Sequence, residues 1–235
     1  MNKLNKQARK LNEKILNLFS KADTKIREGW VLQRIEENKI LINPLYGRME
    51  DPKENIIACE EWCEKNRQKA IYRLLEHESY LLNARLDDLG YKCKYRGTVR
   101  FMDFKQLDNM NLANKEPSLE LHILNSSDTE ENVYGLTFDI FKFALNELSG
   151  NAIAIKGNDQ LNIIALDGGD YLLVQHGEQM QKEVYETLIH YARNNKREGI
   201  LVTELGAKNT TLLDELGFNE SFSYIYRIKQ DTKNA

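Results

Sequence analysis

A duplicated segment constrains the fold of this chain more than any other feature of its sequence. The segment 86–91 (LDDLGY) returns at 213–218 as LDELGF, which places Gly90 and Gly217 127 residues (217 − 90) apart. In both copies an apolar run precedes the segment, and an alternating run of apolar and polar residues follows it. Solenoid repeats recur at about 20 to 50 residues, so this longer spacing indicates a duplicated supersecondary unit. The chain is therefore predicted to contain two related lobes.

The predicted lobes comprise residues 1–108 and 119–235. The segment 109–118 between them is polar, rich in asparagine and contains Pro117, which is typical of a linker. The N-terminal lobe is expected to lack a cofactor site, because its strand-to-helix passage at 43–48 (NPLYGR) carries proline and tyrosine in place of a run of free backbone amides. Any chemistry is therefore expected in the C-terminal lobe or between the lobes.

The composition argues against several classes of partner. The 235 residues carry a formal net charge of −3 and a sequence pI near 5.9, and the basic residues are dispersed without interleaved aromatics. These features disfavour binding to nucleic acid or to an anionic membrane surface. No apolar run approaches the roughly 20 residues of a membrane span, and the charged N-terminus does not have the pattern of a signal peptide. A cytoplasmic protein is expected, and a homodimer is left open.

The cysteine and histidine residues do not indicate a metal site. Cys59 and Cys63 are four residues apart on a predicted helix, so both face the same side, where buried thiols are expected in preference to a metal or redox pair. The third cysteine is Cys93, and the chain has no CxxC motif. The histidines are scattered and share no ligand spacing, so no metal is expected.

Hydrophobic periodicity predicts a mixed α/β chain. Strands and helices alternate in both lobes, which favours an α+β mixed sheet. Helices are expected at 3–19, 53–65, 80–89, 138–150, 179–194 and 209–216, and strands at 30–35, 39–43, 70–75, 95–104, 119–124, 152–155, 162–166, 171–175, 199–204 and 221–229. The segment 167–169 (DGG) marks a tight hairpin turn. The short helix at 209–216 is expected to bury three leucines, with a phenylalanine behind them: Leu212, Leu213, Leu216 and Phe218.

Several short segments of both lobes occur in the order of a known family. They are WVL at 30–32, INPL at 42–45, CEEW at 59–62, LDDLGY at 86–91, LGF at 216–218 and YIYR at 224–227. In this order and with the duplication, they resemble the GNAT superfamily of acyl-CoA-dependent N-acyltransferases, specifically bacterial members with two tandem GNAT-like lobes. The resemblance covers most of residues 10–229 and implies a GNAT-like fold for each lobe.

The resemblance implies an N-acetyltransferase that transfers an acyl group from acetyl-CoA or another acyl-CoA to a small-molecule amine or a protein amine. In that family two parallel strands splay apart and hold the pantetheine arm between them. The pyrophosphate lies on backbone amides of a glycine-containing loop at the N-terminus of the next helix, where the helix dipole favours an anion. An acid protonates the departing thiolate, and a carboxylate or a water relay takes the proton of the attacking amine.

The resemblance places the site between the strand at 171–175 and the next helix. The cofactor-binding residues that it implies are Val174, Gln175, Gly177, Glu178, Gln179, Met180, Gly206 and Asn209. The candidate catalytic residues are His176 as a general base or ligand, Glu204 as a carboxylate that steers the amine, and Tyr224 as a replacement acid. Each has a structural alternative, namely an exposed turn residue, a solvated strand-end carboxylate and a tyrosine packed against the neighbouring helix.

The acyl-CoA segment departs from the family pattern. Residues 174–180 (VQHGEQM) contain one glycine and no arginine, and Glu178 adds negative charge where phosphates bind. Gly206 stands where the family usually has asparagine, and Leu213 stands where it has the tyrosine acid, although leucine cannot donate a proton. Three hypotheses remain open: an N-acyltransferase, a non-catalytic GNAT-like protein that binds a ligand or another protein through an eroded site, and a site for a different acyl carrier or a truncated cofactor.

Overall fold

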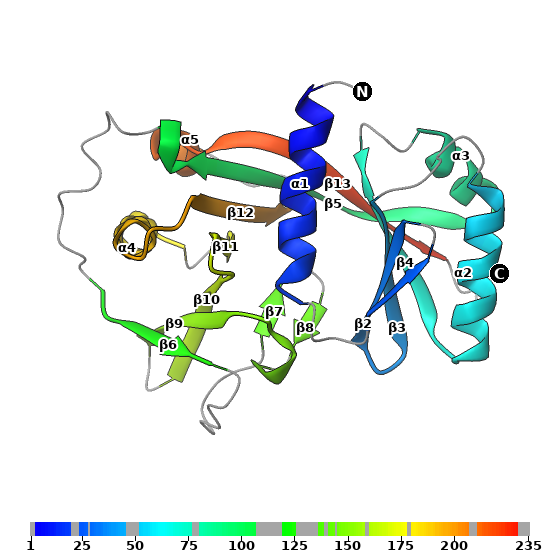
Figure 1. Ribbon diagram of the computed structural model, residues 1–235, viewed down its shortest axis with the longest axis horizontal. Coiled ribbons are helices and arrows are strands. Elements are labelled where there is room, and N and C mark those ends of the chain that lie inside the picture. Colours follow the sequence, from blue (N-terminus) through cyan, green and yellow to red (C-terminus); the bar gives the residue numbers. More distant parts are fainter. Residues whose placement is uncertain are drawn as a thin grey trace. The chain divides into compact units, whose positions relative to one another are not determined.

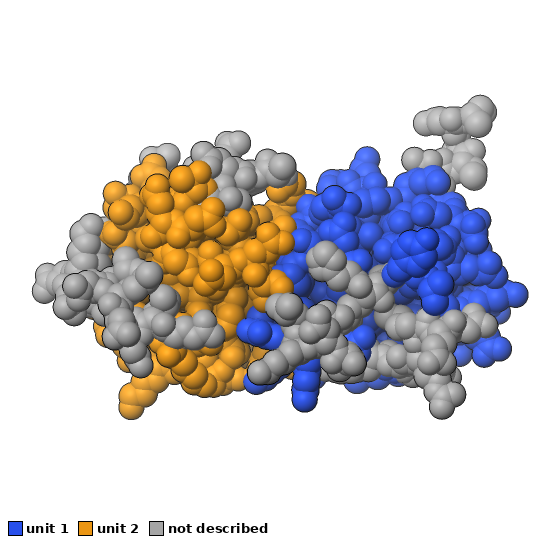
Figure 2. All heavy atoms as spheres, turned by 90° about the horizontal axis from the view of Figure 1, so that it is seen from above, with its two compact units in different colours: residues 1–13, 22–97, 222–235 blue, residues 14–21, 98–221 orange. Residues whose placement is uncertain are grey.

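The computed structural model describes residues 3–19, 24–27, 29–45, 52–76, 80–106, 119–125, 136–138, 141–143, 145–157, 160–177, 180–206 and 211–229. The chain has the mixed α/β fold that the sequence predicts, and it divides into two compact units (Figures 1 and 2). Unit 1 comprises residues 1–13, 22–97 and 222–235, and unit 2 comprises residues 14–21 and 98–221. No helix in the described part of the chain is long and apolar enough to cross a membrane.

The helices are α1 (Lys3–Asn17), α2 (Lys53–Lys65), α3 (Tyr80–Asp88), α4 (Lys182–Asn194) and α5 (Thr211–Glu215). The strands are β1 (Thr24–Arg27), β2 (Trp30–Glu36), β3 (Lys39–Pro44), β4 (Lys69–Leu75), β5 (Tyr91–Asp103), β6 (Leu121–Leu124), β7 (Leu136–Phe138), β8 (Phe141–Phe143), β9 (Asn151–Gly157), β10 (Gln160–Asp167), β11 (Tyr171–Gln175), β12 (Gly199–Leu205) and β13 (Asn219–Lys229). These bounds confirm most of the predicted elements, and β1 is an additional strand.

Unit 1 contains a sheet with the strand order β1-β2-β3-β4-β13, in which β3 and β4 run parallel and the other neighbours antiparallel. Successive side chains of a strand point to opposite faces. One face packs Trp30, Ile42 and Tyr72 against Ile56 of α2 and Leu86 of α3. On the opposite face, α1 is held to β4 by a hydrogen bond between the side chains of Asn12 and Arg73.

Unit 2 contains the carboxyl half of β5 followed by β12, β11, β10, β9 and β6. The β11–β12 pair is parallel, whereas β10 pairs antiparallel with both β9 and β11. Helices α4 and α5 cover one face of these strands. There Leu188 of α4 and Leu213 of α5 share a buried core with Leu172 and Val202 of the central strands. This face carries the predicted site.

The order of the helices and strands repeats along the chain. The order α2-β4-α3-β5 recurs as α4-β12-α5-β13, which confirms the predicted helix–strand–helix–strand connectivity. Local geometry repeats as well: Arg67 and Lys196, just after the first helix of each copy, have φ of 54° and 55°. Gly90 and Gly217 have φ of 82° and 87°, a left-handed conformation that glycine adopts without strain, so the repeated glycine ends the second helix of each copy.

The last strand of each copy takes part in the other unit. Residues 222–229 of β13 belong to unit 1, where Tyr224 pairs with Leu75 of β4, and residues 98–103 of β5 belong to unit 2. Arg227 of β13 binds Asp87 of α3 through two hydrogen bonds of 2.7 and 3.3 Å. The compact units therefore differ from the lobes 1–108 and 119–235 in the placement of residues 14–21, part of β5 and most of β13. The lobe boundaries remain a prediction, and the linker 109–118 lies outside the described residues.

One predicted element is wrong. The segment 138–150 is not an α-helix but contains strand β8 and the 3₁₀ turn Leu145–Glu147, and β8 pairs with β7. The register joins Leu136 to Phe143 and Phe138 to Phe141. Apolar residues alternate with Thr137 and Lys142 here, which is the two-residue period of a strand. Because the run is short, the spacing of its aromatic residues also fits the period of a helix.

Two local predictions are confirmed. Cys59 and Cys63 are buried free thiols, and burial raises their pKa to about 11 and about 12, so both stay protonated at neutral pH. The segment 167–169 forms the turn between β10 and β11, with Gly169 at φ 87° and the Gly168 N–H donating to the Tyr171 carbonyl at 3.0 Å.

Truncation of a buried leucine tests the docking of α5. Leu216 is 1% exposed, so Leu216→Ala is expected to lower the free energy of unfolding by about 2 to 5 kcal/mol. Leu81→Ala, at a leucine of α3 that is 56% exposed, is the matched control and should have little effect. Urea denaturation measures both variants, and equal stability of the two would show that α5 is not docked.

The Asp87–Arg227 contact is expected to depend on pH. The hydrogen bond from Arg227 holds the pKa of Asp87 below its ordinary value of 3.8. The contact therefore contributes stability above that value and loses it as the pH falls through the lowered pKa. Asp87→Asn should lower the Tm at pH 7 and make it less sensitive to acid between about pH 5 and pH 2. Asp88→Asn, at the exposed neighbouring carboxylate, is the control, and an identical acid response of the two variants would contradict the assignment.

Candidate functional site

The parallel strands β11 and β12 position the candidate site at their carboxyl ends. Leu172 pairs with Ile200 and Val174 with Val202, and these apolar side chains lie in the core beneath α4. The strands stay paired to their ends, because Gln175 is in register with Thr203 and the His176 N–H donates to the Thr203 carbonyl at 2.8 Å. The chain then turns toward α4, so His176 and Glu204 end the two strands side by side.

His176 is a buried residue in contact with α4, not an exposed turn residue. Its Nδ1 lies 2.7 Å from the hydroxyl of Tyr185, a residue of the first turns of α4. Burial and, after it, the negative charge of Glu204 raise the pKa of Tyr185, so its phenol stays protonated. The phenol therefore donates to Nδ1 when the imidazole carries its proton on Nε2.

Glu204 is buried and paired, not solvated. It is 2% exposed, and its Oε2 accepts a hydrogen bond of 2.9 Å from Nε of Arg100 on β5. The same guanidinium donates through Nη1 to Asp214 at 2.6 Å and to the Phe218 carbonyl at 3.5 Å. The Oε1 of Glu204 has no hydrogen-bond partner among the described residues. One carboxylate oxygen thus remains available to a donor beside the His176–Tyr185 pair.

The predicted cofactor-binding residues fall into different environments. Val174 is buried in the core under α4, and Gln175 is half-buried in the strand pair. Met180 packs into the same core, and its N–H donates to the Gly177 carbonyl at 3.0 Å, so this amide is already used within the turn. Among the described residues Gly177 borders open space, since a Cβ built there would meet none of their atoms within 4 Å.

Gly206 follows β12 with φ 79° and has no atom within 4 Å of a built Cβ. Glu178, Gln179 and Asn209 lie outside the described residues. Of the predicted set, the structure therefore brings together His176 and Glu204, with Gly177 next to them in the chain.

Tyr224 belongs to unit 1, whereas His176 and Glu204 belong to unit 2. It is fully buried, and its ring lies 4.1 Å from the guanidinium carbon of Arg73. The ring also packs on the backbone of Gly97, where a Cβ would lie 2.3 Å from the tyrosine Cζ. These contacts give Tyr224 a packing role in unit 1.

Sequence reasoning missed Arg100 and Tyr185, which complete the polar cluster. Arg100 and Arg227 are 127 residues apart (227 − 100), the same spacing as Gly90 and Gly217, so the repeat contained a signal for this arginine. No sequence pattern indicated Tyr185 as a site residue, because a tyrosine on the apolar side of a helix is predicted to be a core residue.

The geometry limits how a pantetheine arm can bind. An arm that lies between β11 and β12 as an extra strand does not fit along 171–176, because the two strands bond to each other as far as His176 and Thr203. Beyond this point the open space at Gly177 and the first turn of α4 remain, and Gln181 at the N-cap makes no side-chain capping bond. Gly177 and the N-terminus of α4 are thus the described residues that could hold the arm.

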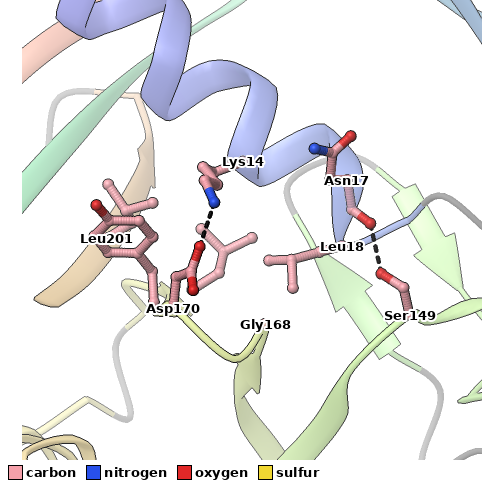
Figure 3. A pocket seen from close by; sticks show the side chains of 9 residues that line it. Lys14, Asn17, Leu18, Ser149, Gly168, Asp170 and Leu201 are labelled. Atoms are coloured by element: carbon pink, nitrogen blue, oxygen red, sulfur yellow. Dashed lines mark hydrogen bonds and ion pairs between the residues drawn. The ribbon is translucent and has the colours of Figure 1, made fainter. Parts of the chain in front are cut away.

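A separate pocket lies on the other face of unit 2, near the amino ends of the same strands (Figure 3). Its volume is about 140 Å³, and Leu18, Leu173 and Leu201 are among the residues that line it. Lys14 and Asp170 also line the pocket and form an ion pair with each other. Its charged groups are therefore already matched, and it is distinct from the cluster around His176.

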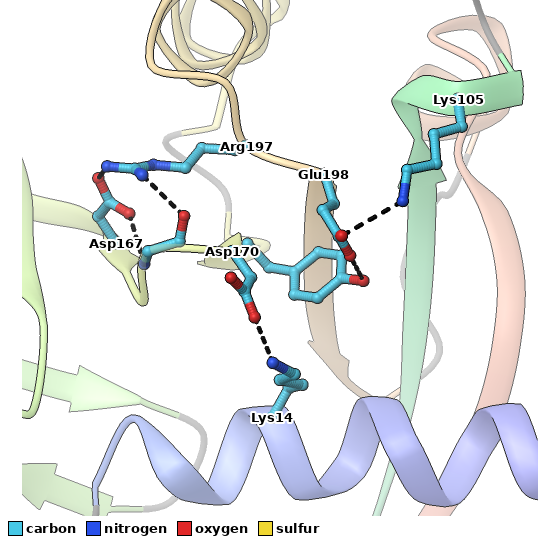
Figure 4. Close-up of polar contacts among 8 residues, drawn as sticks. Lys14, Lys105, Asp167, Asp170, Arg197 and Glu198 are labelled. Carbon is cyan, nitrogen blue, oxygen red and sulfur yellow. Dashed lines mark hydrogen bonds and ion pairs between the residues drawn. The ribbon is translucent and has the colours of Figure 1, made fainter.

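Polar contacts brace the amino ends of β11 and β12 (Figure 4). Asp167 accepts hydrogen bonds from Arg197 at 2.8 Å and from Tyr191 at 2.9 Å. Tyr171 donates to Glu198, which also pairs with Lys105 at 3.2 Å. These contacts lower the pKa of Glu198, with the Tyr171 hydrogen bond as the largest cause. They hold the turn and the strand starts in place, so the polar groups here have a structural role.

Solved structures with similar folds include acetyltransferases. A GCN5-related N-acetyltransferase from Kribbella flavida matches 97% of this chain and 96% of its own, with a TM-score of 0.58 and 9% sequence identity. A GCN5-related N-acetyltransferase from Sphaerobacter thermophilus matches 86% of this chain and 76% of its own, with a TM-score of 0.51 and 10% identity. A functionally unknown conserved protein from Staphylococcus epidermidis matches 89% and 94%, with a TM-score of 0.52 and 9% identity.

No family model and no curated protein matches the sequence. The structural likeness nevertheless extends over nearly the whole chain in the first case. The chain therefore has the fold of the GCN5-related N-acetyltransferases, as the sequence resemblance implied.

Removal of Arg100 is expected to destabilise unit 2 strongly. Arg100→Met leaves the buried charge of Glu204 without a partner, for which we expect a loss of about 3–5 kcal/mol in the free energy of unfolding. Adding Glu204→Gln to this variant should restore part of the loss, because the buried charge is then removed. Asp214→Asn, whose carboxylate is 60% exposed, is the control and should change stability by no more than about 1 kcal/mol. If Arg100→Met and Asp214→Asn lowered the free energy of unfolding equally, the destabilisation assigned to the unpaired charge of Glu204 would be contradicted.

Proposed function

We propose that this protein is a GNAT-type N-acyltransferase whose site lies at the carboxyl ends of β11 and β12 in unit 2. The observation that carries the proposal is the buried cluster of His176, Tyr185 and Glu204 at the ends of a parallel strand pair that leads into a helix N-terminus. The acetyltransferase fold supports the class of reaction, and the cluster supplies groups that hold and move protons.

An acyl-CoA would supply the activated acyl group, and Gly177 and the first turn of α4 would hold it. The raised pKa of Tyr185 keeps a proton on its phenol, which makes that group a proton donor at neutral pH. In the proposed arrangement His176 accepts from this phenol through Nδ1 and carries its own proton on Nε2. The Glu204 Oε1 is an acceptor with no partner among the described residues, suited to an amine, and Arg100 fixes the carboxylate in place. The proposed acceptor is a small-molecule amine or a protein amine.

A second candidate is a non-catalytic GNAT-fold protein that binds a ligand or another protein. Two observations favour it: β11 and β12 remain hydrogen-bonded to their ends, and the Met180 amide is used within the turn. Both features reduce the number of backbone N–H and C=O groups that could form hydrogen bonds with an acyl-CoA. Binding and turnover therefore have to be measured separately, and turnover on a panel of amines distinguishes the two candidates.

Acetyl-CoA binding tests whether the site is retained. At 100 times its Kd, acetyl-CoA should stabilise the protein by about 2.7 kcal/mol, which thermal shift and isothermal titration detect. Gly177→Ala should weaken this effect without lowering the Tm of the free protein, because an added Cβ meets no atom within 4 Å in the described part of the chain. Glu178→Gln should bind more tightly than the parent, since it removes a negative charge from the segment that resembles the phosphate loop.

Ile123→Ala, at an exposed residue of β6 in the same unit, is the control and should bind acetyl-CoA as the parent does. If neither the parent nor Glu178→Gln shows binding heat or a melting shift with acetyl-CoA, the proposed acyl-CoA chemistry is wrong. The assignment of the fold would not change. Binding without turnover would select the non-catalytic candidate.

A further inference from the structure

Unit 1 contains a buried arginine that faces no carboxylate among the described residues. Arg73 on β4 is 4% exposed, and its partners are neutral. Its Nη1 donates to the amide oxygen of Asn12 on α1, and the ring of Tyr224 stacks against the guanidinium. Its Nη2 is buried and has no hydrogen-bond partner in the described part of the chain.

A neighbouring asparagine adds two more buried atoms without a partner. Asn43, near the end of β3, is 0% exposed, and neither its Oδ1 nor its Nδ2 has a hydrogen-bond partner among the residues that the structure describes. The parallel register pairs Ile42 with Tyr72, so Asn43 and Arg73 follow one residue later in each strand and point to the same face. Ile42 and Tyr72 lie in the core beneath α2, so this is the opposite face, the one on which α1 packs.

The positive charge of the Arg73 guanidinium has no counter-charge among the described residues. A guanidinium that is removed from water without a counter-charge destabilises the folded state by several kcal/mol. A buried water can satisfy the N–H groups but leaves the charge uncompensated. An anion can accept hydrogen bonds from the N–H groups and also neutralise the positive charge. The guanidinium is also pre-oriented, because Tyr224 is wedged against the Gly97 backbone and Asn12 holds the other nitrogen, which lowers the entropy lost on binding.

We propose that Arg73 and Asn43 form a binding site for a small carboxylate ligand that also carries a hydrogen-bond donor, such as an α-hydroxy or α-amino acid. The carboxylate accepts from Arg73 Nη2 and from Asn43 Nδ2. A hydroxyl or ammonium group of the ligand donates to Asn43 Oδ1. All three buried atoms are then satisfied, and the positive charge is neutralised. The site belongs to unit 1, so it stands or falls independently of the acyltransferase proposal for unit 2.

Thermal shift and isothermal titration on the full chain test this site with glycolate as the probe. The protein is dialysed extensively and then titrated with sodium glycolate, sodium acetate or sodium chloride at constant ionic strength. Glycolate should raise the Tm by about 3–6 °C for each tenfold increase above its Kd. Acetate, which lacks the donor, should act at higher concentration, and chloride should have the smallest effect.

Variants separate specific binding from a general effect of salt. Arg73→Met should lose the response to glycolate, and Asn43→Leu should bind glycolate no better than acetate. Arg85→Met, which removes a partly exposed arginine of α3 in the same unit, should respond as the parent does. If Arg73→Met does not fold, the parent and Asn43→Leu titrations decide the question by calorimetry.

Two results would overturn the proposal. One is a parent protein that does not respond to glycolate, whatever the Tm of Arg73→Met. The other is an equal response to all three salts in the parent and in Asn43→Leu.

Discussion

The exchange of the last strands imposes the main constraint on this structure, and two arginines at equivalent positions of the repeat fix it. Arg227 of β13 binds Asp87 and the Tyr91 carbonyl, and Arg100 of β5 binds the equivalent Asp214 and Phe218 carbonyl. Each arginine thus joins the final strand of one copy to the second helix of the other. Each guanidinium is almost buried, so displacement of the strand that carries it breaks its hydrogen bonds to both the carboxylate and the backbone carbonyl.

This anchor also shapes the candidate site. The guanidinium that binds Asp214 holds Glu204 at the end of β12, so the carboxylate beside His176 is positioned by a strand from the first copy. A buried ion pair with one oxygen left unpartnered among the described residues is a poor source of stability. It does fix the orientation of the carboxylate, which a group that interacts with an amine requires.

The two copies have placed polar residues differently around equivalent parallel strands. In unit 2, His176 and Glu204 end β11 and β12 on the face covered by α4. In unit 1, Asn43 and Arg73 lie near the ends of β3 and β4, on the face opposite to α2. A shift of one residue along a strand reverses the face, so equivalent strand ends in the two units carry their polar residues on different faces.

Most elements were predictable because their apolar periodicity is local. Helix α2 and strands β4 and β11 have the predicted bounds to within a residue, and the repeated glycines end both short helices as expected. The wrong prediction of a helix at 138–150 also comes from local periodicity. The short run 136–143 fits both the helical and the strand period, and only the pairing of β7 with β8 decides between them. At the site, the sequence indicated His176 and Glu204 but not Tyr185, whose relevance depends on where α4 packs.

The sequence by itself determined the order of the elements, the recurrence of that order along the chain and the segment in which polar residues end a parallel strand pair, because these follow from spacing and from local conformational preference. The tertiary structure decided which side chains meet. Arg100 reaches Glu204 across 104 residues of sequence, and Tyr185 reaches His176 only because α4 packs on β11. It also decided that β13 completes unit 1. Such contacts depend on burial and on strand pairing between distant segments, and no local pattern encodes either of them.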